Sequence, residues 1–184
     1  MSKTRILCVI DTQNDFIDGS LKNETAKERV KNIVDKINDF TGEFIFVTRD
    51  THDEKYLESK EGKKLPVVHC VKGTDGWMVN KEISNALMKK DLSEAHVIRY
   101  IDKPTFDSIN LAKQISHIPG ELEIEFVGFC TDICVISNVF LVKAFVYDRA
   151  EITVDASCCA GVTKESHDAA ILTMKMCQID VINE

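Results

Sequence analysis

The chain has 184 residues, of which 44% are hydrophobic and 29% are charged. This length suits one domain with a sizeable core, and the composition is that of an ordinary globular protein. The formal net charge is −7 and the lysines are scattered, which argues against a nucleic-acid-binding surface. No apolar run approaches the roughly 20 residues that a membrane-spanning helix needs.

The start of the chain and its cysteines indicate the cellular compartment. Residues 1–5 lead directly into a strand-length apolar run, with no long apolar region and no small-residue cleavage site, so we expect no signal peptide. We therefore predict a cytoplasmic protein that contacts neither nucleic acid nor membrane. Its seven cysteines should be reduced there, and most should pack as small hydrophobic residues.

Short β-branched runs alternate along the chain with segments of helical periodicity. The expected strands span residues 5–10, 43–48, 96–101, 122–127, 151–154 and 179–182. The expected helices span residues 24–40, 80–89, 107–115, 132–147 and 164–176. This alternation predicts one α/β domain over residues 1–184, with a three-layer α/β/α architecture around a six-stranded, mainly parallel sheet.

Chemically capable side chains follow three of the expected strands. Asp11 ends the first strand, Lys103 follows the third, and Cys134 begins the helix after the fourth. Because sites in such sheets form beyond the carboxyl ends of the strands, we expect these three side chains to converge. Thr131 or Asp132 should cap that helix, and the helix dipole should favour the Cys134 thiolate.

The three residue types suit nucleophilic catalysis by a thiol. Attack on a carbonyl requires a proton acceptor and donors for the developing oxyanion. Asp11 could accept the proton, backbone amides at the helix start could bind the oxyanion, and Lys103 could stabilise both charged groups. Each residue alone also has an ordinary structural explanation, as a turn aspartate, a solvated lysine or a core cysteine. Their expected placement at one sheet edge favours the catalytic interpretation.

A second group of residues has the composition of a metal site. Asp50 and His52 stand two positions apart after the second expected strand, so both side chains could bind one ion. His69, in "LPVVHC", could be a third ligand brought in by the intervening loop. The alternative is that Asp50 and His52 cap a loop without a metal.

Three motifs together resemble a known family. "VIDTQNDF" (9–16), "DKPTFDS" (102–108) and "VGFCTDICV" (127–135) are similar to segments of the isochorismatase-like cysteine hydrolases, a superfamily that includes the nicotinamidases. The resemblance spans essentially the whole chain and implies the isochorismatase-like hydrolase fold. The most specific element is Thr-Asp-x-Cys-Val after a strand that ends in glycine.

The resemblance assigns roles to the candidate residues. It implies that Asp11 is the general acid and base, Lys103 the third catalytic residue and Cys134 the nucleophile that forms an acyl-enzyme. It also implies a cis peptide bond between Phe129 and Cys130. The backbone amides of Cys130 and Cys134 would then form the oxyanion hole, and the Cys130 sulfur would have no role.

Nicotinamidases carry Asp-x-His and a later histidine that hold a divalent metal, and this metal binds the pyridine nitrogen of the substrate. Their fourth ligand is a histidine or glutamate between these points, for which Glu61 is our candidate, with Glu58 as the alternative. By this resemblance the cofactor would be one divalent ion, Zn²⁺, Mn²⁺ or Fe²⁺, because His and carboxylate ligands select weakly among them. Many superfamily members function without a metal, and no organic cofactor is expected.

The remaining motif residues are candidates for the walls of a substrate pocket or for core packing. Phe16, Trp77 and Phe106 flank the motif loops and are candidates to bind a small ring-bearing amide, although each also suits core packing. We interpret His167 as a capping or packing residue, and Cys158 and Cys159 as packing residues.

The leading functional hypothesis is a cysteine amidohydrolase that converts nicotinamide to nicotinate and ammonia through a thioester. A related hypothesis keeps the same three catalytic residues and changes the substrate to another small amide, a ureido compound or a vinyl ether. A hypothesis of a different class is a thiol or redox sensor that uses Cys130 with Cys134, or Cys158 with Cys159. The superfamily resemblance also favours a homo-oligomer, either a dimer or a tetramer.

Overall fold

A computed structural model describes residues 3–93 and 95–184, and within them six strands form one sheet in the order β3-β2-β1-β4-β5-β6. Met1 and Ser2, with which the N-terminal segment begins, lie outside the described residues. Every neighbouring pair of strands is parallel, which confirms the predicted sheet. The strands are β1 (Thr4–Ile10), β2 (Phe44–Asp50), β3 (Val97–Lys103), β4 (Leu122–Phe129), β5 (Ala150–Ala160) and β6 (Asp180–Ile182).

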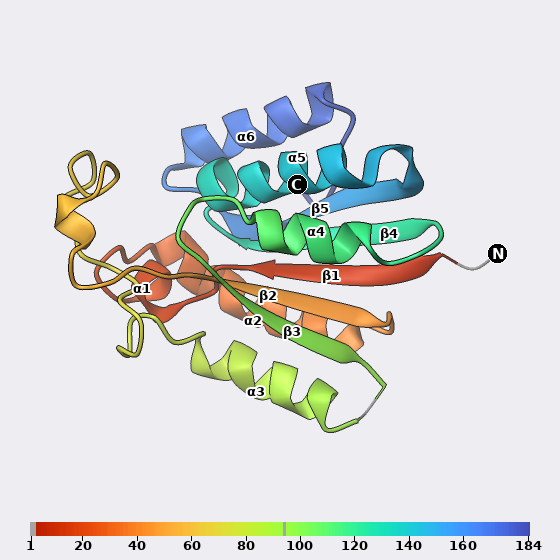
Figure 1. Cartoon of the computed structure of the whole chain (residues 1–184), viewed down its shortest axis with the longest axis horizontal. Helices are drawn as coiled ribbons and strands as arrows, with labels where there is room; N and C mark the ends of the chain where they lie inside the picture. Colours follow the sequence, from red (N-terminus) through yellow and green to blue (C-terminus); the bar gives the residue numbers. More distant parts are fainter. Residues whose placement is uncertain (1–2, 94) are drawn as a thin grey trace.

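Helices cover both faces of the sheet and make it the middle of three layers (Figure 1). One face carries α1 (Asn14–Ile17), α2 (Glu24–Asp39) and α3 (Lys81–Asp91). The other carries α4 (Ile109–Ser116), α5 (Ile136–Val146) and α6 (Lys164–Met176). Three short turns complete the described elements: η1 (Tyr56–Glu58), η2 (Thr131–Val135) and η3 (Tyr147–Arg149). None of the described helices is both long and apolar enough to span a bilayer.

Alternate residues of β1 build the two cores. Ile6, Cys8 and Ile10 pack with α4, α5 and α6, whereas Leu7 and Val9 pack with α1, α2 and α3. This arrangement follows from the two-residue period of a strand, and it explains why β1 is apolar from Ile6 to Ile10. The central strand therefore has no solvated face, and its polar continuation at Asp11 enters a buried environment.

Several strands extend further than the sequence pattern indicates. β2 continues to Asp50 and β3 to Lys103, and these two residues are register partners in the parallel ladder. Both residues are charged, so the β-branched pattern stops before them and the predicted strands ended too early. Their pairing places a carboxylate and an ammonium group side by side at the carboxyl edge of the sheet.

β5 is also longer than predicted, since it continues to Ala160 with a register shift against β4. Cys158 and Cys159 therefore lie within the strand and not beyond it. Cys158 packs in the core under α2, and Cys159 packs in the core under α5 and α6. Their side chains thus enter opposite cores, which confirms the packing interpretation and leaves them unsuited to act as a redox pair.

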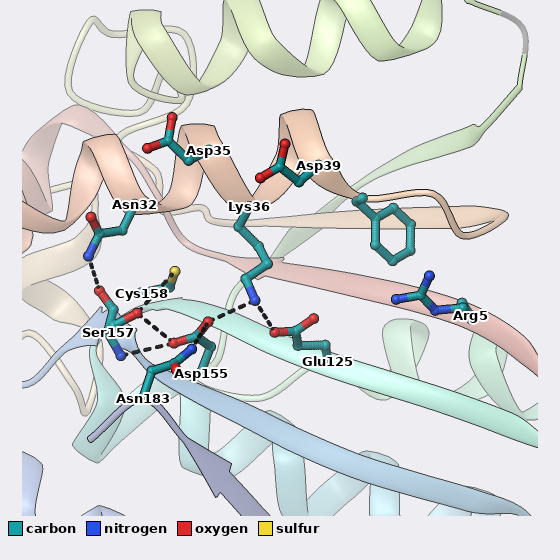
Figure 2. A pocket seen from close by; sticks show the side chains of 11 residues that line it. Arg5, Asn32, Asp35, Lys36, Asp39, Glu125, Asp155, Ser157, Cys158 and Asn183 are labelled. Carbon is teal, nitrogen blue, oxygen red and sulfur yellow. Dashed lines mark hydrogen bonds and ion pairs between the residues drawn. The ribbon is translucent and has the colours of Figure 1, made fainter.

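A partly buried ion group links α2 to the sheet (Figure 2). The Lys36 ammonium lies 2.6 Å from a Glu125 oxygen and 2.8 Å from Asp155 Oδ2. The other oxygen of Asp155 accepts hydrogen bonds from the backbone and hydroxyl of Ser157. Lys36 therefore holds the irregular part of β5 against the helix.

The long connection between β2 and α3 extends beyond the carboxyl edge of the sheet (Figure 1). It returns to β2 through a short parallel bridge between His52 and Val71, so that the segment carrying His69 lies beside the end of the strand. A second bridge joins Val79 to Gln13 at the start of α1, an element that the sequence pattern did not indicate. These bridges bring distant motif residues to one edge.

Candidate active site

Lys103 lies at the centre of a group of reactive side chains at the carboxyl edge of the sheet. Its ammonium is 2.6 Å from Asp11 Oδ2, 3.6 Å from Cys134 Sγ and 3.9 Å from Asp50 Oδ1. It also donates to the Thr105 carbonyl at 3.0 Å. Only 1% of Lys103 is exposed. The structure thus brings together the three residues that the sequence places after β1, β3 and β4.

Backbone geometry at the end of β1 orients Asp11. Its φ of 48° lies in the left-handed region, which aspartate tolerates better than most residues. The Thr48 hydroxyl donates to Asp11 Oδ1 at 2.7 Å, which leaves Oδ2 directed at Lys103. On the neighbouring strand β4, a Cβ on Gly128 would lie only 2.0 Å from the Ile10 carbonyl oxygen. The close approach of β4 to β1 at this point therefore requires glycine at position 128.

The ionic states of Asp11 and Lys103 follow from burial and proximity. Burial raises the pKa of Asp11, and the neighbouring ammonium offsets only part of that rise. Burial acts to lower the pKa of Lys103, but the negative charge of Asp11 and the proximity of Cys134 and Asp50 outweigh it and hold this pKa above its usual range. Asp11 is therefore a stronger proton acceptor than an ordinary carboxylate, and Lys103 stays a cation.

Cys134 lies in a π-type turn, η2, which precedes α5. The N-cap position is Cys130, and no side chain caps the turn, so the prediction of a Thr131 or Asp132 cap is wrong. Thr131 pairs instead with His167, and Asp132 accepts from the backbone of the segment before α6.

Burial also decides the state of the Cys134 thiol. It raises the pKa of Cys134 well above its usual value, and the Lys103 ammonium lowers it only in part. Burial therefore opposes the thiolate that the helix start was predicted to favour. A neutral thiol needs a base that removes its proton during attack. Asp11 and Cys134 both contact the Lys103 ammonium, which places the Asp11 carboxylate near the thiol.

The peptide bond between Phe129 and Cys130 is cis, as the family resemblance implies. The amides of Ile133 and Val135 donate to the Cys130 carbonyl at 3.1 and 3.0 Å, so both are used inside the turn. Burial raises the pKa of the Cys130 thiol to about 12, so this sulfur is a poor nucleophile at neutral pH.

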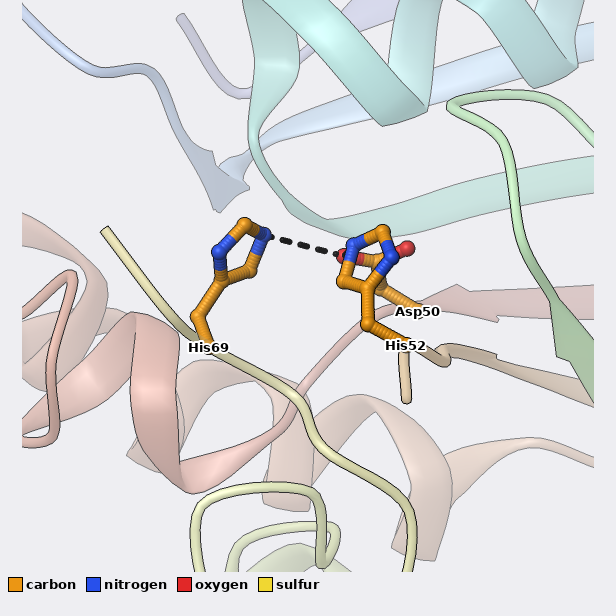
Figure 3. Close-up of side chains that lie close together, drawn as sticks. All are labelled: Asp50, His52 and His69. Carbon is orange, nitrogen blue, oxygen red and sulfur yellow. Dashed lines mark hydrogen bonds and ion pairs between the residues drawn. The ribbon is translucent and has the colours of Figure 1, made fainter. Parts of the chain in front are cut away.

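Asp50, His52 and His69 form a compact cluster (Figure 3). Asp50 joins this cluster to Lys103, whose ammonium is 3.9 Å away. Asp50 Oδ2 lies 3.0 Å from His52 Nε2 and 3.3 Å from His69 Nε2, and the three ligand atoms all lie within 4.8 Å of one another. His69 Nδ1 is 2.8 Å from the Val67 carbonyl. Because a carbonyl only accepts, Nδ1 carries a proton, and Nε2 is the ring nitrogen that a neutral His69 would offer to a metal ion. This donor set fits a divalent metal ion.

Asp50 is ionised in this cluster, as a carboxylate ligand must be. Burial acts to raise the pKa of Asp50, but hydrogen bonds from His52 and His69 outweigh it and hold this pKa below its usual range. Glu61 Oε1 lies 3.9 Å from His52 Nε2, whereas Glu58 is exposed in η1 and does not line the neighbouring cavity. Glu61 is thus the better placed of the two carboxylates to join the cluster of Asp50, His52 and His69, and its role as fourth ligand stays a prediction.

A cavity of about 520 Å³ opens onto both groups of residues. Cys130 and Cys134 line one side of it, and Asp50, Glu61 and His69 line another. The remaining lining residues are Phe16, Leu21, Lys22, Asn23, Glu24, Leu65, Phe106, Ile133 and Val162. A small molecule in this cavity would contact the thiol and the metal-type cluster at once.

Comparison with known proteins places this arrangement in a family. The model of the isochorismatase domain matches residues 5–183. The chain belongs to the isochorismatase family. No curated protein sequence matches it significantly.

The fold of this isochorismatase-family hydrolase is similar to that of solved nicotinamidases. It matches the nicotinamidase/pyrazinamidase of Bacillus subtilis with a TM-score of 0.81 at 22% identity, covering 98% of this chain and 100% of that one. It matches the pyrazinamidase/nicotinamidase of Streptococcus mutans with a TM-score of 0.79 at 24% identity, covering 97% and 100%. For the pyrazinamidase of Pyrococcus horikoshii, solved in complex with zinc, the TM-score is 0.75 at 21% identity, covering 98% and 99%. At these identities the similarity shows the shared fold.

Of the three aromatic residues expected to line the site of this isochorismatase-family protein, Phe16 and Phe106 do so and Trp77 does not. The Trp77 ring lies under the Arg49 guanidinium, 4.0 Å from its carbon, and its indole N–H donates to the Thr51 hydroxyl at 2.8 Å. Trp77 is buried in the core on the α3 side. The prediction for Trp77 is therefore wrong, because the path of the long β2–α3 connection turns the ring inward.

Gln13 is a supporting residue that sequence reasoning missed. It is fully buried, and its side-chain amide pairs with the backbone of Asp50, accepting from the N–H at 2.7 Å and donating to the C=O at 2.8 Å. The same amide donates to the Trp77 carbonyl at 2.9 Å. Its presence inside the "DTQNDF" motif was the available signal. Leu21, Asn23 and Val162 of the cavity wall carried no such signal in the sequence.

Proposed function

We propose that this protein is a cysteine amidohydrolase that converts nicotinamide to nicotinate and ammonia. The observation that carries the proposal is the single buried ammonium of Lys103, which contacts both Asp11 and Cys134 at a cavity shared with an Asp-His-His cluster. The family and the nicotinamidase-like fold support the same conclusion.

In the first half of the proposed reaction, the Asp11 carboxylate takes the thiol proton of Cys134 as Sγ attacks the amide carbon. The backbone amides of Cys130 and Cys134 donate to the resulting oxyanion, and Lys103 stabilises the anionic sulfur before the new C–S bond is complete. Asp11 then returns the proton to the leaving nitrogen. The C–N bond breaks, ammonia leaves, and a thioester to Cys134 remains.

In the second half, Asp11 takes a proton from a water molecule, whose oxygen attacks the thioester carbon. The C–S bond breaks, nicotinic acid is released and loses its proton to solvent as nicotinate, and the Cys134 sulfur recovers its proton from Asp11. Each proton removed is thus returned, and the protein ends in its starting state. Burial suits Asp11 to this alternation, because a raised pKa improves both the basic and the acidic step.

Asp50, His52 and His69, with Glu61 beside them, are the residues that would hold a divalent metal. Such an ion, when bound, supplies a Lewis acid that coordinates the ring nitrogen of the substrate. Zn²⁺, Mn²⁺ and Fe²⁺ all suit this ligand set. Phe16 and Phe106 would then flank the ring from the apolar part of the cavity.

The test is ammonia release by the purified protein from nicotinamide, pyrazinamide and benzamide, before and after chelation. We expect turnover of nicotinamide and pyrazinamide, and only weak turnover of benzamide because it lacks the ring nitrogen. After chelation, the rates for the three amides should become similar. Cys134→Ala is the control for contaminating activity. Turnover of other small amides, ureido compounds or vinyl ethers in place of nicotinamide would keep the cysteine hydrolase and replace its substrate. Inactivity on all of them would contradict the proposal.

We further propose a cytoplasmic location, to which the predominantly buried, reduced cysteines point, and a homo-oligomer of two or four chains, which the family resemblance supports. Light scattering of the purified protein measures the second. A monomer at micromolar concentration would contradict it.

A further inference from the structure

The turn that carries Cys134 is attached to α6 by its own polar side chains. No side chain caps the turn, and the Thr131 hydroxyl lies 2.8 Å from His167 Nδ1. Next to it, the Asp132 carboxylate accepts from the Val162 amide, with distances of 3.1 and 3.2 Å to its two oxygens. Two consecutive residues of the turn therefore use α6 and the segment before it as their support.

His167 is held firmly enough to provide such support. It lies near the beginning of α6, where Thr163 and Ser166 form a capping box and the His167 amide donates to the Thr163 carbonyl at 3.0 Å. The chain passes so close that a Cβ on Gly161 would lie 2.8 Å from the His167 Cβ. The position of the imidazole is thus set by the helix start.

The contact between Thr131 and His167 joins two uncharged side chains. Burial lowers the pKa of His167 and outweighs the opposing charge of Asp168, so the ring is neutral at neutral pH. A neutral imidazole and a hydroxyl can pair in either sense. Thr131 is fully buried, so removal of the imidazole would leave its hydroxyl without this partner.

The same segment forms part of the cavity wall. Val162 lines the cavity together with Cys134, and the Asn23 side chain, which also lines it, donates to the Gly161 carbonyl at 2.7 Å. A displacement of the turn relative to α6 would therefore move the thiol with respect to both Lys103 and the substrate cavity.

We infer that His167 is a positioning residue, which acts through Thr131 to hold the Cys134 thiol beside Lys103. His167 contacts no reacting atom in this arrangement. The inference rests on the proposed hydrolase function for its kinetic readout, and on the reactivity of the thiol for a readout that is independent of any substrate.

The experiment compares His167→Ala, Thr131→Val and the double variant with His167→Gln and Thr131→Ser, which keep a hydrogen-bonding group. His117→Ala, at the exposed end of α4, is the matched control. We expect either disruptive variant to lower kcat at least about tenfold with KM within about threefold, since small misplacements of a nucleophile are costly. The double variant should be little worse than the worse single one, because both remove the same contact. The conservative variants should recover most of kcat.

The second readout is the rate at which iodoacetamide alkylates Cys134, measured by peptide mass spectrometry. We expect His167→Ala and Thr131→Val to slow it at least about fivefold relative to wild type and to His117→Ala, because the thiol loses its position beside the Lys103 ammonium. This rate remains informative if the wild type hydrolyses no amide, so a failure of the proposed function is distinguishable from a failure of the inference.

Unchanged kcat and unchanged alkylation in folded His167→Ala, with only a lower melting temperature, would overturn the inference in favour of a purely structural contact. Additive losses in the double variant would also overturn it. If His167→Ala does not fold, the comparison of Thr131→Val with Thr131→Ser decides the question by the same two readouts.

Discussion

Among the described residues, two lysines each lie between carboxylates. Each of them also has a nearby cysteine that lines a cavity. Lys36 pairs with Glu125 and Asp155, and Cys158 lines the same cavity of about 440 Å³. Lys103 pairs with Asp11 and lies 3.9 Å from Asp50, and Cys134 lines the cavity of about 520 Å³. By residue type alone the two regions are alike.

Contacts and burial separate them. Lys103 is 1% exposed and lies 3.6 Å from the Cys134 sulfur, whereas the side chain of Lys36 is 23% exposed and makes its contacts with carboxylates. Asp155 also accepts hydrogen bonds from Ser157 and Asn183, so both of its carboxylate oxygens are occupied in structural contacts of β5 (Figure 2). A lysine between carboxylates is thus a stabilising element by default, and it becomes part of a candidate catalytic group where it also touches a thiol.

The sharpest way to break this comparison is to remove each thiol. Cys134→Ala should lower kcat/KM for amide hydrolysis by about 10⁴-fold or more, because the nucleophile is lost. Asp11→Asn should have a similar effect, since the thiol would keep its proton. Cys158→Ala should stay within about threefold of wild type and lose stability by about 1 kcal/mol from the cavity it creates. Comparable losses in Cys134→Ala and Cys158→Ala would show that the two regions had been assigned wrongly.

Replacement of each lysine tests the comparison from the other side. Lys103→Met should lower kcat by about 10²–10⁴-fold, because Asp11 and the attacking sulfur lose their shared cation. Lys36→Met should leave kcat within about threefold and lower the free energy of unfolding by about 1–3 kcal/mol, since Glu125 and Asp155 lose a charged partner. Steady-state kinetics and denaturant titration measure the two effects. An activity loss confined to Lys36→Met would contradict the assignment.

Metal content sharpens the contrast, because the Lys103 region has the Asp50, His52 and His69 cluster beside it, whereas no described histidine lines the Lys36 cavity. Purified protein should contain about one divalent ion per chain by elemental analysis, and His52→Ala should reduce this content severalfold at least, since one of the ligands is lost. We also expect KM for nicotinamide to rise by about tenfold or more. His96→Ala, at the opposite end of the sheet, is the control. Equal metal content in His52→Ala and wild type would exclude this site.

A smaller effect is expected at the second cysteine of the active cavity. Cys130→Ala should retain kcat within about threefold, because the proposal uses only its backbone amide. Kinetics and the circular dichroism spectrum measured together would separate a loss of function from a loss of structure. A hundredfold loss in folded Cys130→Ala would assign a role to its sulfur and revive a thiol-pair mechanism.

The smallest expected effect is a pH dependence of stability from the Lys36 group. Burial acts to raise the pKa of Asp155, but Lys36 and Ser157 outweigh it and hold this pKa below its usual value. A carboxylate of this kind stabilises the fold above its unfolded pKa of about 4 and loses that contribution as the pH falls through its lower folded pKa. The difference in unfolding free energy between wild type and Asp155→Asn should therefore be constant from about pH 5 to 8 and shrink below about pH 4. A difference that does not change with pH would contradict this.

The order of elements and the meeting of Asp11, Lys103 and Cys134 could be predicted from the sequence. Strands and helices alternate regularly, and the carboxyl ends of parallel strands necessarily lie at one edge. Asp50 and His69 also met as expected, although 18 residues of loop separate them, because the connection returns at Val71 to pair with His52, just beyond the end of β2.

Features that depend on tertiary packing could not be predicted in this way. The state of the Cys134 thiol depends on how completely the chain buries it, and burial outweighs the helix start on which the sequence argument relied. Trp77 turns into the core because Arg49 and Thr51 provide partners on another strand end. Thr131 bonds to His167, which is 36 positions away, so its failure to act as a cap has no local signal.

The central claim is that the Cys134 sulfur becomes acylated during turnover, and peptide mass spectrometry after rapid acid quench of wild-type protein with nicotinamide tests it directly. Our account predicts a nicotinoyl group on the peptide that contains Cys134, formed and consumed within the turnover time, and absent from Cys134→Ala. An acyl group on another residue, or steady turnover by Cys134→Ala, would contradict it.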